Sequence, residues 1–281
     1  MNQKKIKQII VSGSFLIVLI AFLFVTQLQQ RPAGVRVTFF DIGQGDSALI
    51  QTSAGSTILI DGGPDRTILE KLGAALPFYE HSIDLMILTH PHADHLNGLL
   101  AVLERYEVKN ILYTDVAYDA PQYDEWLQRL ESVSSKKLIA HAGQTFTFDE
   151  VQLEVLYPLS DMSGQSIDDI NESSIVARLS YQNNSILFTG DAGVPTEQVL
   201  LNAGVELESD ILKVGHHGSD TSSSIVFINA VSPAIAVISL GNNTFGHPKA
   251  SVLKRLEYVG AAVKRTDQLS DIVIELPLDK K

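Results

Sequence analysis

The chain has 281 residues, of which 45% are apolar and 19% are charged, so it is long enough for one large folded domain and is not globally disordered. The absence of cysteine excludes disulfide scaffolds, thiolate metal sites and cysteine nucleophiles, so any metal ligand must be His, Asp, Glu or Asn. Lys4, Lys5 and Lys7 are the only charges in residues 1–30, which leaves 18 basic against 33 acidic side chains in the rest. This acidic part of the chain should repel polyanions at long range, so broad nucleic-acid binding through a basic surface is not expected.

The amino terminus predicts a membrane segment. Residues 1–8 form a basic end, and residues 9–25 form an uncharged run that would be roughly 25 Å long as a helix. The positive-inside rule places the lysines in the cytoplasm and the rest of the chain outside. We predict a single-pass transmembrane helix over residues 9–26 that anchors an extracytoplasmic domain in the cell membrane. A cleaved signal segment, which would make the protein secreted, is the alternative, although no A-x-A cleavage site follows the run.

Residues 27–34 form a predicted linker, and strands alternate with helices through a predicted domain at 35–278. Apolar patterning predicts strands at 35–40, 48–52, 56–60, 83–89, 108–113, 137–140, 151–157, 174–181, 185–189, 210–214, 234–240 and 271–276. Helical periodicity predicts helices at 67–76, 96–106, 122–131, 195–202, 223–230 and 249–259. Two halves, each with strands followed by alternating helices, predict an α/β fold of two packed sheets with helices outside.

Six of the eight histidines lie in loops that follow predicted strands. The first loop carries His90, His92, Asp94 and His95 directly after the apolar strand at 83–89, a place where α/β folds bind ligands. An H-x-H-x-D-H run offers three imidazoles and one carboxylate within six residues, a mixture that zinc and similar divalent ions accept. His90 and His92 can point at one ion while Asp94 and His95 reach a second.

Asp191, His216, His217 and His247 lie in three later loops, and each loop again follows a predicted strand. Asp191 alone is a weak signal, because a cap for the next helix explains it equally well. If the strands run in the same direction, the side chains of all these loops converge on one rim of the fold.

The order of the motifs is more specific than any single motif. An H-x-H-x-D-H run followed by a strand that ends in Gly-Asp resembles the metallo-β-lactamase superfamily. Further motifs, in the right order, resemble the hydrolase domain of the ComEC competence-protein family over residues 35–276. They are FFDIGQGD at 39–46, LIDGG at 59–63, NESS at 171–174, FTGD at 188–191, LKVGHHGS at 212–219 and GHP at 246–248. The resemblance implies a four-layer αββα sandwich with a dinuclear metal site at one edge.

The resemblance also implies a set of metal ligands. His90 and His92 match the ligands of the first ion, and Asp94 and His95 match those of the second. Asp191 matches the carboxylate that bridges the two ions.

Three further positions are less settled by the resemblance. His216 matches the last ligand of the second ion, with His247 as the competing candidate. Asn171 stands where the wider superfamily has a third histidine for the first ion. An amide oxygen is a weaker ligand than imidazole, so the identity of the two bound ions is left open between Zn²⁺ and Mn²⁺.

Asp61, Asp46 and Ser219 are predicted to support the ligands or to face the substrate. Asp61 resembles a residue that orients a ligand imidazole through its other nitrogen, although a turn before the following glycines also explains it. Asp46 lies in a Gly-rich turn, and hairpin geometry is its alternative explanation.

Asp94, His217 and His247 are the predicted catalytic residues. Asp94 would hold and orient a hydroxide ion, and His217 or His247 would stabilise or protonate the leaving oxygen. No Gly-x-Ser-x-Gly motif is present, which favours metal-activated hydrolysis over a serine nucleophile.

The sequence therefore predicts a metal-dependent hydrolase that activates water at a dinuclear site, a phosphodiesterase or deoxyribonuclease of ComEC type. Its expected partners are DNA or another phosphodiester and the membrane, and no protein partner can be deduced. A hydrolase of a small ester, lactone or phosphodiester unrelated to DNA uptake is one alternative. A non-catalytic metal-binding accessory protein is another, which the intact H-x-H-x-D-H run disfavours.

Overall fold

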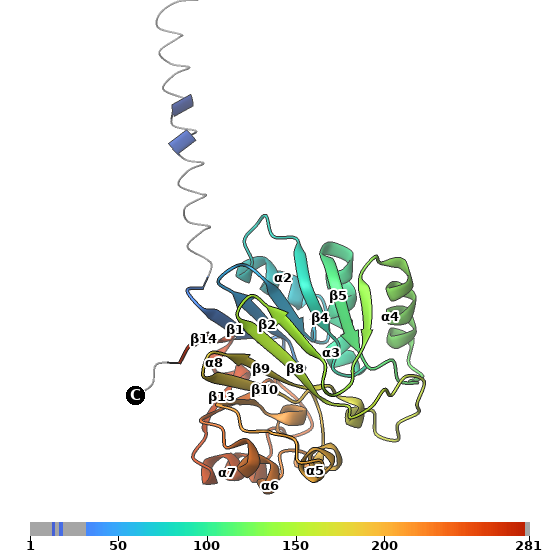
Figure 1. Ribbon diagram of the computed structural model, residues 1–281, viewed down its shortest axis with the longest axis vertical. Coiled ribbons are helices and arrows are strands. Elements are labelled where there is room, and N and C mark those ends of the chain that lie inside the picture. The colour runs from blue at the N-terminus through green and yellow to red at the C-terminus, as the bar shows by residue number, and fades with distance from the viewer. Residues whose placement is uncertain (1–12, 15–16, 19–31, 279–281) are drawn as a thin grey trace, which may run out of the picture.

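Two β-sheets packed face to face, with helices over both outer faces, form the folded part of the computed structural model (Figure 1). The structure describes residues 13–14, 17–18 and 32–278. The predicted basic end, most of the predicted membrane segment and most of the predicted linker therefore lie outside the described residues. Within the described ranges, none of the helices has the length and apolarity that crossing a bilayer requires.

The first sheet combines the beginning of the domain with its last strand. Its order is β14-β1-β2-β3-β4-β5-β6, and β3 to β6 run parallel. The bounds are β1 (Val35–Phe39), β2 (Ala48–Thr52), β3 (Thr57–Ile60), β4 (Ser82–Ile87), β5 (Glu107–Tyr113), β6 (Lys136–Ile139) and β14 (Ile272–Leu276). Leu85, Met86 and Ile87 at the end of β4 are buried on both faces, as a continuous apolar run predicts.

The second sheet has the order β13-β12-β11-β10-β9-β8-β7, and β10 to β13 run parallel. The bounds are β7 (Thr145–Phe148), β8 (Val151–Tyr157), β9 (Val176–Tyr181), β10 (Asn184–Phe188), β11 (Ile211–Lys213), β12 (Ile235–Ile238) and β13 (Ala262–Arg265). In both sheets the parallel strands end at one edge, and the loops after them carry the predicted ligands.

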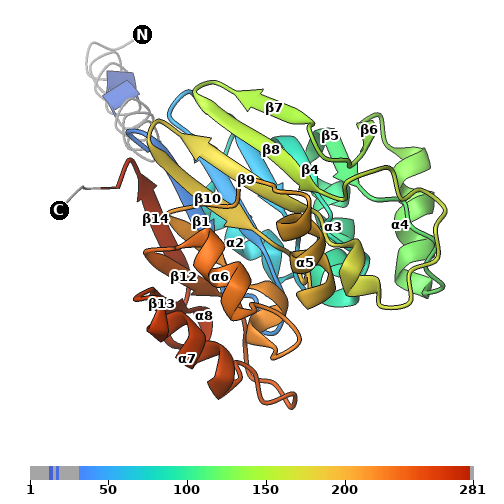
Figure 2. The same ribbon diagram turned by 60° about the horizontal axis from the view of Figure 1, so that its bottom comes forward.

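Helices cover the outer face of each sheet (Figure 2). They are α2 (Thr67–Ala75), α3 (Ala93–Arg105) and α4 (Pro121–Ser132) on the first sheet and α5 (Val194–Asn202), α6 (Ile225–Val231) and α7 (Ala250–Tyr258) on the second. One apolar cluster fills the space between the sheets, and one lies beneath each helical layer. Three cores between four layers confirm the predicted αββα sandwich.

Every strand and helix predicted within residues 35–278 is present, with ends that shift by at most three residues. The short edge strands β7 and β13, the short helix α8 (Thr266–Leu269) and the 3₁₀ turns η1 (Ile170–Ser173) and η2 (Gly215–Gly218) were not predicted. Four-residue, half-exposed strands carry too little apolar patterning to be recognised. The last strand in the chain, β14, pairs with β1 in the first sheet, although it follows the strands of the second sheet in sequence.

Candidate metal centre

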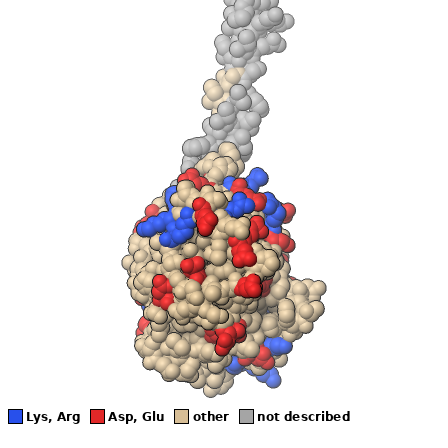
Figure 3. Space-filling view, turned by 90° about the vertical axis from the view of Figure 1, so that its right-hand side faces the viewer, with Lys and Arg blue, Asp and Glu red and all other residues tan. Residues whose placement is uncertain are grey.

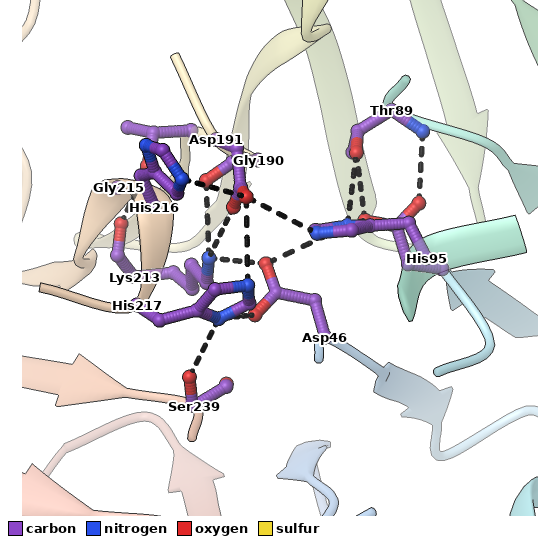
Figure 4. A network of polar contacts seen from close by, with 12 residues as sticks. Asp46, Thr89, His95, Gly190, Asp191, Lys213, Gly215, His216, His217 and Ser239 are labelled. Atoms are coloured by element: carbon purple, nitrogen blue, oxygen red, sulfur yellow. Dashed lines mark hydrogen bonds and ion pairs between the residues drawn. The ribbon is translucent and has the colours of Figure 1, made fainter. Parts of the chain in front are cut away.

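The predicted ligands meet at one edge of the sandwich, where parallel strands of both sheets end. The segment that leads from β4 into the first turn of α3 contributes residues 90–95, the loop after β10 contributes Asp191, and the loop after β11 contributes His216 and His217. His95, His216 and His217 surround the carboxylate of Asp191 (Figure 4). Segments more than a hundred residues apart in the chain thus form one polar cluster.

The H-x-H-x-D-H run leads from β4 into α3, which begins at Ala93. His90 Nε2 lies 3.1 Å from His92 Nδ1 and 4.0 Å from Asp191 Oδ2, and His95 Nε2 lies 3.4 Å from the same oxygen. Burial, reinforced by the nearby His95, holds the pKa of His90 well below its usual value, so this imidazole is neutral and free to act as a ligand.

Asp61 fixes the position of His95. Its Oδ2 lies 2.8 Å from His95 Nδ1 and accepts a 2.7 Å hydrogen bond from Thr89 Oγ1, while Oδ1 accepts a 2.8 Å bond from Thr89 N. The loop after β3 reaches this position because Gly62 and Gly98 let two backbones touch: a Cβ on Gly98 would lie only 1.8 Å from the Gly62 oxygen. Asp61 therefore has the orienting contact predicted for it, and it leaves His95 Nε2 to face Asp191.

His217, rather than His216, lies against the carboxylates. Its Nε2 is 3.3 Å from Asp94 Oδ2 and 3.4 Å from Asp191 Oδ2, and its Nδ1 is 2.8 Å from the Ser239 carbonyl oxygen. His216 Nε2 is 4.0 Å from Asp191 Oδ2, and 25% of its side chain is exposed. Both histidines have left-handed backbone angles, with φ of 47° and 52°, which splay the two side chains apart.

Charge pairing sets the protonation of this cluster. Burial would lower the pKa of His217, but Asp191 and Asp46 outweigh it and raise that pKa to about 10. Burial likewise opposes the charged form of His95, yet Asp191 and Asp61 hold its pKa well above the usual value. Burial would raise the pKa of Asp191, but His217 and His95 keep it well below its usual range. Two imidazoles therefore hold protons that a bound cation would displace.

Lys213 is a buried cation that was not predicted as part of the site. Its ammonium forms an ion pair with Asp46, donates a 3.0 Å hydrogen bond to the Gly190 carbonyl and lies 3.8 Å from Asp191 Oδ1. Only 4% of its side chain is exposed. A lysine inside the otherwise apolar strand β11 was the available signal, because an isolated charge is almost never fully buried without a partner. Asp46, predicted to face the site, is held there by this pair.

Several ligand atoms are grouped closely enough to hold a cation. Among the described residues, the groups His90, His95 and Asp191; Asp94, His95 and His217; and Asp46, Asp191 and His217 each have ligand atoms within 4.8 Å of one another. His95 Nε2, His217 Nε2 and Asp191 Oδ1 are buried without a hydrogen-bond partner. Buried polar atoms are nearly always satisfied, so these nitrogen and oxygen donors fit Zn²⁺ or Mn²⁺.

Three other predicted residues have distinct surroundings. Asn171 is buried in η1, and its Oδ1 has no hydrogen-bond partner. Ser219 is also buried, but its hydroxyl lies 2.9 Å from Thr221 Oγ1 within its own loop. His247 is half-buried, and its ring lies 5.8 Å from that of His216, outside the groups of close ligand atoms.

Comparison with known proteins is consistent with this geometry. A family model described as the metallo-beta-lactamase superfamily matches residues 40–242. ComE operon protein 3 of Bacillus subtilis (strain 168) is 28% identical over 95% of this chain and 36% of its own length. Competence protein ComA of Neisseria gonorrhoeae is 34% identical over 82% and 31%, respectively. Exodeoxyribonuclease WalJ of Streptococcus pneumoniae serotype 2 (strain D39 / NCTC 7466) is 26% identical over 39% of each chain. The chain thus spans about a third of the length of the first two of these relatives, and the ComEC-like resemblance is confirmed.

Proposed function

The chain belongs to the metallo-β-lactamase superfamily, and we propose that it is a metal-dependent phosphodiesterase, a deoxyribonuclease of the ComEC type. The observation that carries the proposal is the convergence of two buried nitrogens, His95 Nε2 and His217 Nε2, which both lie 3.4 Å from Asp191 Oδ2. The names of two relatives support the substrate, because one is a competence protein and the other an exodeoxyribonuclease.

We assign the donor atoms to two proposed ligand sets that share Asp191. The first set is His90, His92, Asn171 and Asp191, and the second is Asp94, His95, His217 and Asp191. This assignment exchanges the sequence-based roles of His216 and His217, since His217 Nε2 is the nitrogen within 3.4 Å of both Asp94 and Asp191. Two divalent cations held there would polarise the phosphodiester and lower the pKa of water to about 7.

The chain's own residues position the water and the leaving group. Asp94, in the first turn of α3, accepts a hydrogen bond from the attacking water and orients it. His216 and His247 face the exposed side of the cluster and donate hydrogen bonds to the phosphate or a proton to the leaving oxygen. Burial, with His216 adjacent, holds the pKa of His247 below its usual value, so at neutral pH His247 is an uncharged imidazole that donates an N–H hydrogen bond to the phosphate.

The formal net charge of −12 restricts how a polyanion can bind. Figure 3 shows acidic side chains spread across the face it displays, with no continuous basic stripe. Several exposed cations are neutralised in pairs, such as Arg66 with Glu104 and Lys109 with Asp84. A DNA strand is therefore held by the metal ions at the centre and not along an extended basic groove.

The test is hydrolysis by the purified full chain with Mn²⁺ or Zn²⁺. Single-stranded DNA, a small phosphodiester and a lactone are the three substrates, and we expect DNA cleavage that a chelator abolishes. The double variant His90→Ala, His92→Ala should lose the metal and the activity together. Cleavage that persists unchanged in this variant, or hydrolysis of the lactone alone, contradicts the proposal.

We also propose that residues 9–26 anchor the domain at 35–278 on the outer face of the cell membrane. The uncharged run and the lysines before it support this placement. Protease added to intact cells should then degrade the domain, and deletion of residues 1–26 should release it from the membrane fraction. A protected domain would contradict the orientation.

A further inference from the structure

The loop between β12 and α7 presents an exposed aromatic ring beside the metal centre. Phe245 is 62% exposed, and its ring stacks on that of His247 with centroids 5.7 Å apart and an interplanar angle of 28°. His247 in turn lies against His216, whose Nε2 is 4.0 Å from Asp191 Oδ2. The imidazoles of His247 and His216 therefore lie between the phenyl ring and the Asp191 carboxylate, and the phenyl ring is exposed to solvent.

The loop that carries Phe245 is held in place by its own polar groups. Asn243 Nδ2 donates to the carbonyls of Gly241 and His247, at 3.0 and 3.1 Å, and Asn243 Oδ1 accepts from His247 N at 3.0 Å. Lys249 Nζ donates a 2.7 Å bond to the Phe245 carbonyl. The ring is thus presented by a fixed backbone, so little conformational entropy is lost when a flat ligand stacks on it.

Phe245 ends a continuous row of rings across the centre. From one end to the other the row is Tyr118, His92, His90, His95, His217, His216, His247 and Phe245, with neighbouring centroids 4.2 to 6.2 Å apart. The two ends differ in exposure. Tyr118 is half-buried and packs on Tyr123, whereas Phe245 leaves most of its surface to solvent. Of the two, Phe245 is the ring that can accept a stacked partner.

We propose that Phe245 is a specificity-determining residue that stacks on a nucleobase next to the phosphodiester bound at the metal centre. This inference rests on the proposed function. With a net charge of −12 the surface adds little affinity for phosphates, so stacking must supply much of the strand binding beyond the cations. Base–aromatic stacking is worth about 1–3 kcal/mol per base and tolerates any sequence, because every base has a π-face.

The test compares a short single strand of DNA with an abasic strand of equal length and charge. For the full chain with Mn²⁺, kcat/KM should be about tenfold higher for the strand with bases, mainly through KM. Phe245→Ala should reduce this ratio to about one, and Phe245→Trp should restore it. Phe245→Leu, which keeps apolar bulk without a π-face, should behave like Phe245→Ala. The matched control is Phe78→Ala. Phe78 is 72% exposed and lies in the loop before β4, whereas the metal centre lies at the other end of this strand.

The outcomes separate the two proposals. A ratio in Phe245→Ala equal to that of the starting protein, or an equal loss in Phe78→Ala, overturns the stacking role. A starting ratio of one also overturns it, while leaving the deoxyribonuclease proposal intact. If the starting protein cleaves neither strand, the proposed function itself fails. Melting curves by circular dichroism confirm that each variant is folded, which an exposed position favours.

Discussion

The two segments that carry most of the proposed ligands, at 89–95 and at 213–219, differ in their backbone geometry. The first is an extended segment that runs into a helix, so local spacing alone separates His90 and His92 from Asp94 and His95. The second has two consecutive residues in the left-handed region, so neighbouring histidines diverge: one is buried against the carboxylates and the other is partly exposed. Where the backbone is regular, the direction of each ligand side chain can be predicted from sequence spacing. Where the backbone is irregular, that direction depends on the tertiary contacts of the loop.

The largest effect should come from the buried cation that supports the second loop. Lys213→Met removes the ammonium that pairs with the buried carboxylate of Asp46, and breaking a buried ion pair costs about 3–5 kcal/mol. Chemical denaturation of the full chain without metal should show this loss in the free energy of unfolding. Lys109→Met is the control, because Lys109 is 55% exposed in its pair with Asp84 and should lose at most about 1 kcal/mol. Equal losses in both variants would mean that Lys213 does not support the centre.

The second largest effect should separate the adjacent histidines. His217→Ala should bind one cation fewer and lose at least about 100-fold in kcat/KM, more than the loss of an orienting partner usually causes. His216→Ala should keep both cations and lose about tenfold in kcat/KM, which is roughly the effect of removing one hydrogen bond to a charged group. Elemental analysis of dialysed protein measures the metal content. The reverse pattern would restore the sequence-based assignment of His216 as the ligand.

A smaller effect is expected at the partner that orients the first loop. Asp61→Asn replaces the oxygen that lies 2.8 Å from His95 Nδ1, and it should weaken metal binding by about 10–100-fold. Asp65→Asn is the matched control in the same loop, since Asp65 is exposed and its carboxylate accepts a hydrogen bond from Thr67 N and contacts none of the proposed ligands. Metal affinity measured by competition with a fluorescent chelator distinguishes them. An unchanged affinity in Asp61→Asn would show that His95 needs no orienting partner.

The smallest signal is the proton balance of metal binding. Because Asp191 and neighbouring carboxylates raise the pKa values of His95 and His217, the latter to about 10, both imidazoles hold protons at pH 7 that a cation displaces. Calorimetric titration in two buffers should detect proton release, and metal affinity should rise with pH. Without metal, the same protons stabilise the fold below about pH 6.5, and this contribution is lost as pH rises toward 10. Binding without proton release would contradict these pKa directions.

Apolar patterning predicted most of the fold but not all of its connections. The limits of β2 and β8 agree with the sequence, because long buried or alternating runs determine a strand locally. Strand β14 has the same kind of pattern, but its place in the first sheet depends on pairing with β1, more than two hundred residues away. Nothing in its local sequence expresses that pairing.

The sequence by itself determined the kind of centre: the H-x-H-x-D-H run, the absence of cysteine and the motif order define a metal site of nitrogen and oxygen ligands. Only the tertiary structure decided that His217 lies against Asp94 and Asp191, that Lys213 pairs with Asp46, and that Phe245 ends the row of rings. The physical reason is the sequence distance over which each kind of interaction acts. Periodicity and spacing act within a few residues, whereas these contacts join loops from different strands, whose meeting depends on how the two sheets pack.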